Sequence, residues 1–393
     1  MRHLFAEAIM QGDFQCMYIY LDNAATTKPC EAAVNAAFYA MVEGFGNPSS
    51  LHKLGVEAEK LLTAARKDIA AGLVSSPECI YFTSGATEGN NLAIFGSAEN
   101  YGRRKKKLVT TAIEHPSVAE PTAKLEKQGY TVVRIKPDCQ GNIDPDEIVS
   151  AVDDETFLVS CMLVNNETGL ILPIKQAFSA IKRCHPKVIT HCDAVQAFMK
   201  LPIKASELCA DVITVSGHKV HAVKGVGAVY VKKGIRIAPV MLGGGQEGGI
   251  RSGTESVPLI SAFGAAARTL LANQSTAYRN AEEINAYLTA RLKTLDFITI
   301  NSCGDNRSPY ILNFSVDGIR SEIMLHFLES KGIYVSSGSA CSKGGKSKVL
   351  AAFGVSDKLI DSALRVSISC ASTKGEMDAL ITALREGKLA IRK

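Results

Sequence analysis

One lysine in this sequence stands among side chains that suit covalent chemistry. Lys219 closes the segment Ser-Gly-His-Lys (residues 216–219) at the end of an apparent strand, with Ser216 and His218 beside it. An amine in this place can form a Schiff base with an aldehyde, while the hydroxyl and the imidazole donate hydrogen bonds to an anionic group. Because a lone lysine in a loop is usually only solvated, the neighbouring segments must decide between these two interpretations.

A turn that could bind phosphate is the second feature. Residues 83–88, Thr-Ser-Gly-Ala-Thr-Glu, follow another apparent strand and open a helix. The free backbone N–H groups of this segment and the Thr87 hydroxyl could hold a phosphate at the positive end of that helix. The same residues also suit a tight turn followed by an ordinary helix cap, and the segment alone leaves both open.

An acidic residue ends a third strand, where residues 191–196 read His-Cys-Asp-Ala-Val-Gln. The Asp193 carboxylate could pair with a protonated ring nitrogen and the Gln196 amide could bond a ring hydroxyl, although Asp193 also suits a helix N-cap. The phosphate turn, the acidic residue and the lysine follow one another in the order typical of a pyridoxal phosphate (PLP) site. We therefore predict PLP as the cofactor.

The elements that must position these residues predict an α/β fold. Between residues 78 and 233, short β-branched runs alternate with stretches of helical periodicity, which indicates a large domain with a mostly parallel seven-stranded sheet flanked by helices. In such sheets, ligands bind at the carboxyl ends of the strands. Upstream, Ser50 is expected to cap a helix whose apolar stripe, from Leu51 to Ile69, packs on the sheet. The expected strands are residues 79–83, 108–113, 131–135, 157–164, 188–192, 212–215 and 227–231.

A smaller α+β domain is expected after the Gly-rich stretch 243–253. A long helical region, about residues 257–295, leads into short strand candidates at 297–300, 311–316, 333–335 and 364–369. The predicted organisation has four parts. They are an N-terminal extension (1–16), a segment that joins the small domain (17–29), a large PLP-binding domain (30–265) and a small C-terminal domain (266–393) that carries the cysteine segment near residue 341.

Short motifs from about residue 18 to about residue 373 together resemble the NifS/IscS-type cysteine desulfurases, which are class V members of the fold type I PLP enzymes. Each motif is short, but their combination is specific. They are LDNAATT (21–27), NPSS with His52 (47–52), SGATE (84–88), EH (114–115), VNNE (164–167), the Asp193 and Gln196 segment, SGHK (216–219), RSGT (251–254) and SSGSAC (336–341).

The resemblance implies a role at the cofactor for each matching residue. Lys219 would bind PLP covalently, and His115 would stack on its ring as a second catalytic residue. Asp193 would pair with the ring nitrogen, and Asn166 and Gln196 would contact the ring oxygen. The phosphate would be held by Ala86, Thr87, Ser216 and His218, with Thr254 reaching in from the other subunit of a homodimer.

At the substrate, the resemblance implies that Arg365 clamps the carboxylate and that Asn23 lies close by. A bidentate guanidinium suits a carboxylate, although a structural ion pair is the alternative for Arg365. Cys341 decides between functions. It stands in a small, polar, Gly-rich stretch whose composition is typical of exposed segments, unlike the cysteines inside apolar runs. A free surface cysteine is the alternative, and the Ser-Ser-Gly-Ser-Ala motif (336–340) before it, shared with the resembled family, favours Cys341 as the nucleophile that takes the sulfur.

The implied reaction converts L-cysteine to L-alanine and leaves sulfur on Cys341 as a persulfide. A sulfur acceptor protein, either a carrier or a scaffold of iron–sulfur cluster assembly, would then receive it. Another class V PLP enzyme, such as an aminotransferase, a selenocysteine lyase or a kynureninase-like hydrolase, would keep Lys219 and Asp193 but would not need Cys341. A non-catalytic sulfur-carrier binding module is the alternative of a different class.

Three departures from the family pattern set limits on this interpretation. Residues 221–223 read His-Ala-Val where the family often has Tyr-Gly-Pro, beside the lysine. Tyr310 stands where Asn is usual, at an expected substrate contact. The chain also stops soon after Leu384, without the long tail by which housekeeping members dock a scaffold, so the identity of the acceptor is open.

Composition argues against several other classes. The net charge of +5 is small, aromatic residues are 6% and Trp is absent, so we expect no nucleic-acid partner. No run reaches the roughly 18 apolar residues that span a bilayer, and residues 1–16 do not fit a signal peptide, so we expect a cytoplasmic protein without a membrane contact. The 11 cysteines lack a framework spacing, which predicts reduced thiols. The cluster formed by Cys184, His185, His191 and Cys192 lacks a C-x-x-C pair, so no metal site is predicted.

Overall fold

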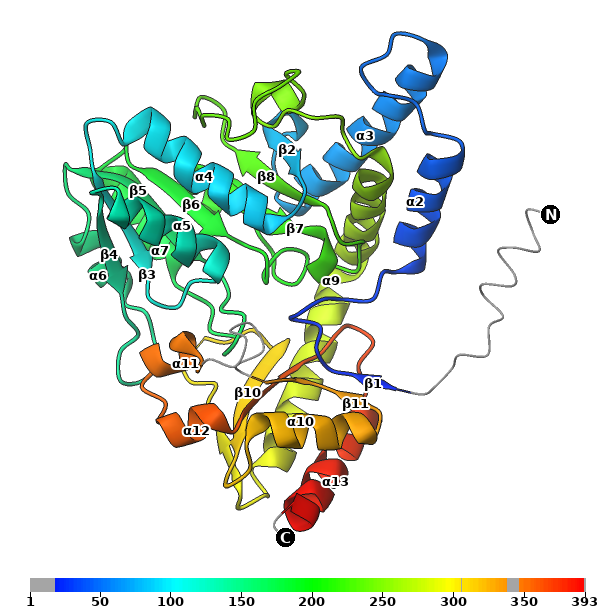
Figure 1. Cartoon of the computed structure of the whole chain (residues 1–393), viewed down its shortest axis with the longest axis vertical. Helices are drawn as coiled ribbons and strands as arrows, with labels where there is room; N and C mark the ends of the chain where they lie inside the picture. The colour runs from blue at the N-terminus through cyan, green and yellow to red at the C-terminus, as the bar shows by residue number, and fades with distance from the viewer. Residues whose placement is uncertain (1–17, 305, 338–345, 392–393) are drawn as a thin grey trace.

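The computed structural model describes residues 18–304, 306–337 and 346–391 (Figure 1). A seven-stranded sheet forms its larger half, with strand order β2-β8-β7-β6-β5-β3-β4. Only β8 runs antiparallel to its neighbours in this sheet. The predicted α/β class and the seven strands are confirmed. Their bounds are β2 (Ile80–Thr83), β3 (Lys107–Thr111), β4 (Thr131–Ile135), β5 (Thr156–Met162), β6 (Ile189–Asp193), β7 (Val212–Ser216) and β8 (Gly227–Val231).

Both faces of this sheet are covered, and alternation along the strands separates two apolar cores. On β3, Leu108 belongs to the core beneath helices α4 (Ala86–Tyr101) and α5 (Pro116–Lys127), while Val109 belongs to the core on the other face. Because both faces are packed, every residue of β5, β6, β7 and β8 is buried. The second core includes helix α7 (Ile174–Cys184), and helices α6 (Pro145–Ser150) and α8 (Ala205–Leu208) pack against α7.

The helix predicted from Ser50 differs from the expectation. Helix α3 spans Lys53–Gly72, and its cap is His52, whose Nδ1 accepts from the Gly55 N–H at 3.3 Å. Ser50 instead closes a turn, because its N–H donates to the Asn47 carbonyl. The predicted apolar stripe begins too early, since Leu51 is 99% exposed. Helix α3 packs chiefly against α9 (Val257–Leu292) and also contacts β2 of the sheet.

Helix α9 connects the large sheet to the smaller half of the molecule (Figure 1). Helix α2 (Glu31–Val42) also packs against α9. The predicted domain boundary at residues 265/266 falls inside α9, a 36-residue helix that continues from there to Leu292. Within the described residues, no helix is both long enough and apolar enough to cross a membrane.

The smaller half contains a four-stranded antiparallel sheet with strand order β12-β13-β10-β9. Near the start of the chain, β1 (Ile19–Tyr20) pairs in parallel with β11 (Ile333–Tyr334), so the N-terminal segment lies against this half. Helices α10 (Ser321–Ser330) and α13 (Lys374–Ile391) pack together there. The remaining elements are β9 (Ile298–Ile300), β10 (Ile311–Val316), β12 (Ser336–Ser337), β13 (Ala363–Ser367), α11 (Lys348–Ala352) and α12 (Asp357–Asp361).

Candidate active site

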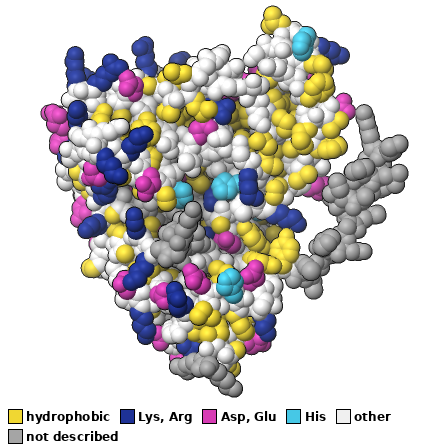
Figure 2. Space-filling model, in the orientation of Figure 1, with side chains coloured by type: hydrophobic (Ala, Val, Ile, Leu, Met, Phe, Trp, Pro, Cys, Tyr) yellow, Lys and Arg dark blue, Asp and Glu magenta, His cyan; other side chains and the backbone are white. Residues whose placement is uncertain are grey.

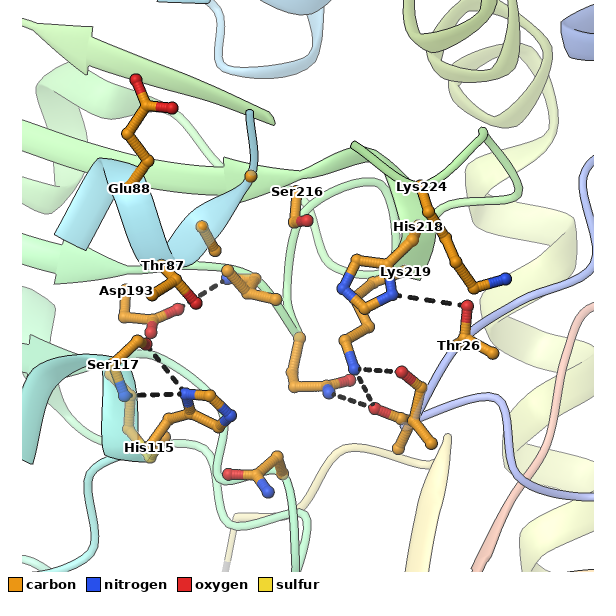
Figure 3. Close-up of a pocket in the computed structure, with 18 of the residues that line it drawn as sticks. Thr26, Thr87, Glu88, His115, Ser117, Asp193, Ser216, His218, Lys219 and Lys224 are labelled. Carbon is orange, nitrogen blue, oxygen red and sulfur yellow. Dashed lines mark hydrogen bonds between the residues drawn. The ribbon is translucent and has the colours of Figure 1, made fainter. Parts of the chain in front are cut away.

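A cavity of about 570 Å³ opens at the carboxyl ends of the central strands, between the large sheet and β13 (Figure 3). The structure brings ten of the predicted site residues to its walls, although they are spread over nearly 280 residues of sequence. These ten residues are Ala86, Thr87, His115, Asn166, Asp193, Gln196, Ser216, His218, Lys219 and Arg365.

The helix start predicted to bind phosphate forms one end of this cavity. Gly85 has φ 155° and ψ 179°, a conformation open essentially to glycine alone, and it turns the chain from β2 directly into α4. Gly89 lets α4 sit close to the sheet, because a Cβ there would lie 2.8 Å from Thr214 Cγ2 and 2.9 Å from Val229 Cγ2. The N–H groups of the first turn therefore point into the cavity from a fixed position.

Ser216 and His218 stand opposite this helix start (Figure 3). Ser216 Oγ is buried and has no hydrogen-bond partner among the described residues. Burial lowers the pKa of His218 to about 4, and the neighbouring Lys219 acts in the same direction. The Glu88 carboxylate already has protein partners, because it accepts from the Ser84 N–H and from Arg251 Nε, both at 2.9 Å.

Asp193 lies at the other end, where β6 stops. Its Oδ1 accepts from the Val195 N–H at 3.0 Å, and its Oδ2 accepts from Asn90 Nδ2 at 2.7 Å. The first bond resembles the helix-cap use of aspartate, and the second is an additional contact from α4. Both fix the carboxylate in a buried position at the cavity wall.

His115 is the N-cap of α5, and its ring borders the same end of the cavity (Figure 3). Nδ1 accepts from the Ser117 N–H at 3.1 Å and lies 2.8 Å from Ser117 Oγ. Burial lowers the pKa of His115, Asp193 opposes this shift, and Lys219 adds to it. A neutral ring with its proton on Nε2 fits these contacts.

Lys219 follows β7 in a short 3₁₀ turn and reaches across to the N-terminal segment. Its Nζ donates to the carbonyl oxygens of Ala24 and Ala25, both at 2.6 Å. Gln196 Nε2 donates to the same Ala24 carbonyl at 2.9 Å. The backbone of the N-terminal segment thus forms the cavity floor beneath the amine.

Arg365 brings the smaller half of the molecule into the site. From β13, it donates to Asp22 Oδ1 at 2.8 Å and to the Asn166 carbonyl at 3.0 Å. Arg365 Nε and Asn166 Oδ1 are buried without a partner among the described residues. The structural ion pair weighed as an alternative is therefore present, and the same guanidinium lines the cavity with one donor unpaired.

Three predicted residues are not brought to this cavity. Asn23 donates to the Ser367 carbonyl at 2.9 Å and lines a cavity of about 20 Å³ behind Lys219. Thr254 lines a separate cavity of about 80 Å³ beside Ser84 and Gly225. Cys341 lies outside the described residues. The two departures at His221 and Tyr310 line the same small cavity as Asn23, so they lie behind the lysine rather than at the main opening.

Three neighbours of the site were missed from the sequence. Asn90 and Ser117 support Asp193 and His115, and the spacing of Asn90 three residues after Thr87 on one helix was an available signal. Lys200 donates to Gln196 Oε1 at 3.1 Å, and burial, with Lys219 and Arg365 nearby, lowers its pKa to about 7. His191, one of the residues in the Cys/His cluster noted in the sequence, is buried in the sheet. Its two ring nitrogens form hydrogen bonds with Ser160 and Thr214.

The polar groups that line this cavity suit PLP. The unpaired Ser216 Oγ lies beside the positive end of α4, where a phosphate would find donors. A carboxylate suited to a protonated ring nitrogen lies at Asp193, and an amine lies at Lys219 on the same cavity. Asn166 Oδ1 and Arg365 Nε are two further buried polar atoms with capacity for a ligand.

Comparison with known proteins agrees with this fold. The family model for the class V aminotransferases matches residues 19–380. A "NifS/IcsS protein homolog" from Lactobacillus delbrueckii subsp. bulgaricus is 39% identical over 375 residues, which are 94% of this chain and 96% of the relative. A "Cysteine desulfurase IscS" from Methanosarcina thermophila is 36% identical over 370 residues, which are 94% of this chain and 91% of the relative.

A solved structure described as a "NifS-like protein" superposes with a TM-score of 0.90 at 34% identity and covers 95% of this chain and 100% of its own. The chain belongs to the class V aminotransferase family. Within that family it belongs to the NifS/IscS-type cysteine desulfurases, which confirms the resemblance seen in the sequence.

Proposed function

We propose that this protein is a PLP-dependent cysteine desulfurase that converts L-cysteine to L-alanine and transfers the sulfur to Cys341. The observation that carries the proposal is the convergence of Lys219, Asp193 and Arg365 on one cavity in a chain of the NifS/IscS type. These side chains provide an amine, an acidic ring partner and a carboxylate clamp, which the reaction requires.

In the proposed enzyme, PLP when bound supplies an electron sink for carbanion chemistry. Lys219 would hold its aldehyde carbon covalently, and Asp193 would hold the ring nitrogen. His115 would stack on the ring, and Asn166 and Gln196 would bond the ring oxygen. The phosphate would take hydrogen bonds from Ala86, Thr87, Ser216 and His218.

The chain's own groups then bind the substrate and move its protons. Arg365 Nε has no partner among the described residues, so it can donate to the substrate carboxylate without breaking the Asp22 pair. Once the substrate amine has freed it, Lys219 Nζ would be the base for the Cα proton, because it lines the same cavity as Arg365 and Asp193. His115 Nε2 is a second group able to exchange a proton at the cavity.

The sulfur step is assigned to Cys341 on the sequence motif. Its thiolate attacks the substrate sulfur, the carbon–sulfur bond breaks, and the electron pair stays on carbon, where a proton completes the alanine methyl group. Cys341 then carries the persulfide, and a sulfur acceptor protein or a reducing thiol receives the sulfur. No oxidant is consumed in this transfer.

The test is an assay of the purified protein with L-cysteine and a reductant. Equal amounts of alanine and sulfide are expected, and Lys219→Ala should give neither. Alanine without sulfide, or no product from a protein that retains PLP, would contradict the proposed reaction.

A homodimer is part of the proposal. Figure 2 shows hydrophobic side chains gathered over α2. On α2, Phe38 is 61% exposed, and Phe45, three residues after the helix ends, is 65% exposed, which is unusual for a surface that meets only water. A second copy of the chain on this surface would also give Thr254 a route to the partner's phosphate. Sedimentation that shows a monomer with tightly bound PLP would contradict the dimer.

A cytoplasmic location is part of the proposal. All nine described cysteines are free thiols, which supports a reducing environment. Fractionation of cells that produce the protein, followed by detection with an antibody, would test the location directly.

A further inference from the structure

Asn90 lies where three elements of the site meet, and the proposed reaction gives it no role. It belongs to α4, one turn after Ala86, and its side chain is fully buried. Its Nδ2 lies 2.7 Å from Asp193 Oδ2, at the end of β6, and 2.8 Å from Ser117 Oγ, in the first turn of α5. Ser117 in turn contacts the His115 ring.

We propose that Asn90 is a positioning residue that joins Asp193 to the Ser117–His115 pair and holds both in place for the cofactor ring. The inference rests on the proposed function, because it concerns residues assigned to PLP. It adds a link between the two groups that border the ring end of the cavity.

The chemistry of the groups fixes the direction of each hydrogen bond in this link. A carboxylate only accepts, so the Asn90 amide must turn its NH₂ group and not its oxygen toward Asp193. The second N–H of the same group donates to Ser117 Oγ. The Ser117 hydroxyl hydrogen is then left to donate to His115 Nδ1, which also accepts from the Ser117 backbone N–H. The His115 proton therefore lies on Nε2, which is the nitrogen not used in the cap.

Asn90 also has a buried polar atom that lowers the stability of the fold, so a contribution to stability does not explain why an asparagine stands there. With both N–H hydrogens in use, its Oδ1 is buried without a partner among the described residues. A buried oxygen without a donor destabilises the fold, and an apolar side chain of similar shape would avoid it. The same amide nitrogen nonetheless contacts two groups at the cofactor site, which is typical of a residue that positions its neighbours.

The helix that carries Asn90 also begins with the proposed phosphate cradle. Ala86 and Thr87 lie in its first turn, and the close packing at Gly89 fixes α4 against β7 and β8. The distance between the phosphate end and the ring-nitrogen end of the cavity is thus set by a single rigid element. A shift at Asn90 would move Asp193 relative to the cradle.

The experiment compares Asn90→Leu with Asn91→Leu, which makes the same chemical change one residue further along α4. Among the described residues, Asn91 bonds the Thr87 carbonyl in its own helix, and it lines a neighbouring groove rather than the cofactor cavity. Apoprotein of each variant is titrated with PLP, and the pH midpoint of the visible band is then measured on the loaded protein. Asn90→Leu should weaken PLP binding about tenfold to a hundredfold, the range expected for one lost hydrogen bond to a charged group, and should shift the midpoint. Asn91→Leu should bind PLP within about twofold of wild type.

Ser117→Ala provides a second variant that keeps the Asn90–Asp193 bond and removes only the link to His115. It should weaken PLP binding severalfold, and the double variant should lose less than the sum of the two single losses, because the side chains act through one chain of bonds. Wild-type affinity and an unmoved band in Asn90→Leu would overturn the inference, as would losses that add independently. If Asn90→Leu does not fold, an unchanged band and affinity in Ser117→Ala would overturn it. None of these measurements uses cysteine, so a wild-type protein that binds PLP without desulfurase activity would contradict the proposed function alone.

Discussion

The two ends of the cavity differ in how their polar groups are paired. At the ring-nitrogen end, Asp193 and His115 already have protein partners through Asn90 and Ser117. At the phosphate end, Ser216 Oγ is buried and has no partner among the described residues. Groups of the first kind are held in place before a ligand binds, while the second kind gains its partner from the ligand. Substitutions at the two ends should therefore divide differently between stability and cofactor binding.

The largest effect is expected where the cofactor itself is held. Lys219→Ala should lose the visible absorbance of bound PLP and lower alanine production by several orders of magnitude. Lys200 and Lys224 also line cavities at the site, so the same substitution at each of them is the control for the loss of bound PLP. Borohydride reduction followed by peptide mass spectrometry should find PLP on residue 219 of the wild type. A reduced link on another lysine of the wild type would contradict the assignment.

Two serine substitutions test the difference between the two ends of the cavity most directly. Ser216→Ala should weaken PLP binding about tenfold while the free energy of unfolding of the apoprotein stays within about 0.5 kcal/mol, because no protein bond is lost. Ser117→Ala should lower the free energy of unfolding of the apoprotein by about 1 kcal/mol, because two hydrogen bonds lose a partner. Urea unfolding and PLP titration of both variants test this. Equal stability losses at the two ends would remove the distinction.

A packing effect at the phosphate end is expected from Gly89→Ala. The added Cβ would press α4 away from Thr214 and Val229 at a cost of about 1–3 kcal/mol, and PLP binding should weaken because the cradle moves with the helix. Gly375→Ala, in the exposed first turn of α13, is the matched control, because only Thr373 Oγ1 lies near its Cβ position. Similar unfolding curves for the two variants would show that Gly89 is not a packing constraint.

The last of these effects concerns pH at the phosphate end. Since burial lowers the pKa of His218 from 6.5 to about 4, the unfolded chain takes up this proton more readily than the folded one. The free energy of unfolding should therefore fall as pH drops from about 6.5 toward about 4. In His218→Gln apoprotein this part of the pH dependence should be smaller. An unchanged slope in urea titrations between pH 7 and pH 5 would contradict the assigned pKa direction.

Much of the fold could be predicted because the strands are short, β-branched and followed by polar loops. The beginning of α3 could not be predicted in the same way. Leu51 and Leu54 fit the helical apolar period, yet both are exposed, because periodicity does not separate a core stripe from a surface available to another chain. The turn at Asn47 also competes for Ser50, which leaves His52 as the cap.

Site residues at strand ends could be predicted from the sequence, whereas residues that hold other site residues in place by hydrogen bonds could not. Asp193 is the last residue of β6 and Lys219 comes three residues after β7, positions that the sequence indicates. The contact of Asn90 with Asp193 joins residues 103 positions apart, and its pattern within α4 resembles that of an ordinary polar helix residue. The roles of Thr254 and Cys341 stay predictions. Thr254 would act in a second subunit, and Cys341 lies outside the described residues.

The most direct test of a cysteine desulfurase is the fate of sulfur in wild type and Cys341→Ala, measured side by side with L-cysteine. The variant should fold, retain PLP and its visible band, and still change its spectrum when cysteine is added. Alanine release and persulfide labelling should fall by several orders of magnitude, because the other ten cysteines stand in no comparable motif. A persulfide on residue 341 of the wild type, lost in the variant, is the predicted result. Near-normal alanine release by Cys341→Ala would contradict the sulfur-transfer mechanism and favour a lyase or another PLP activity at the same site.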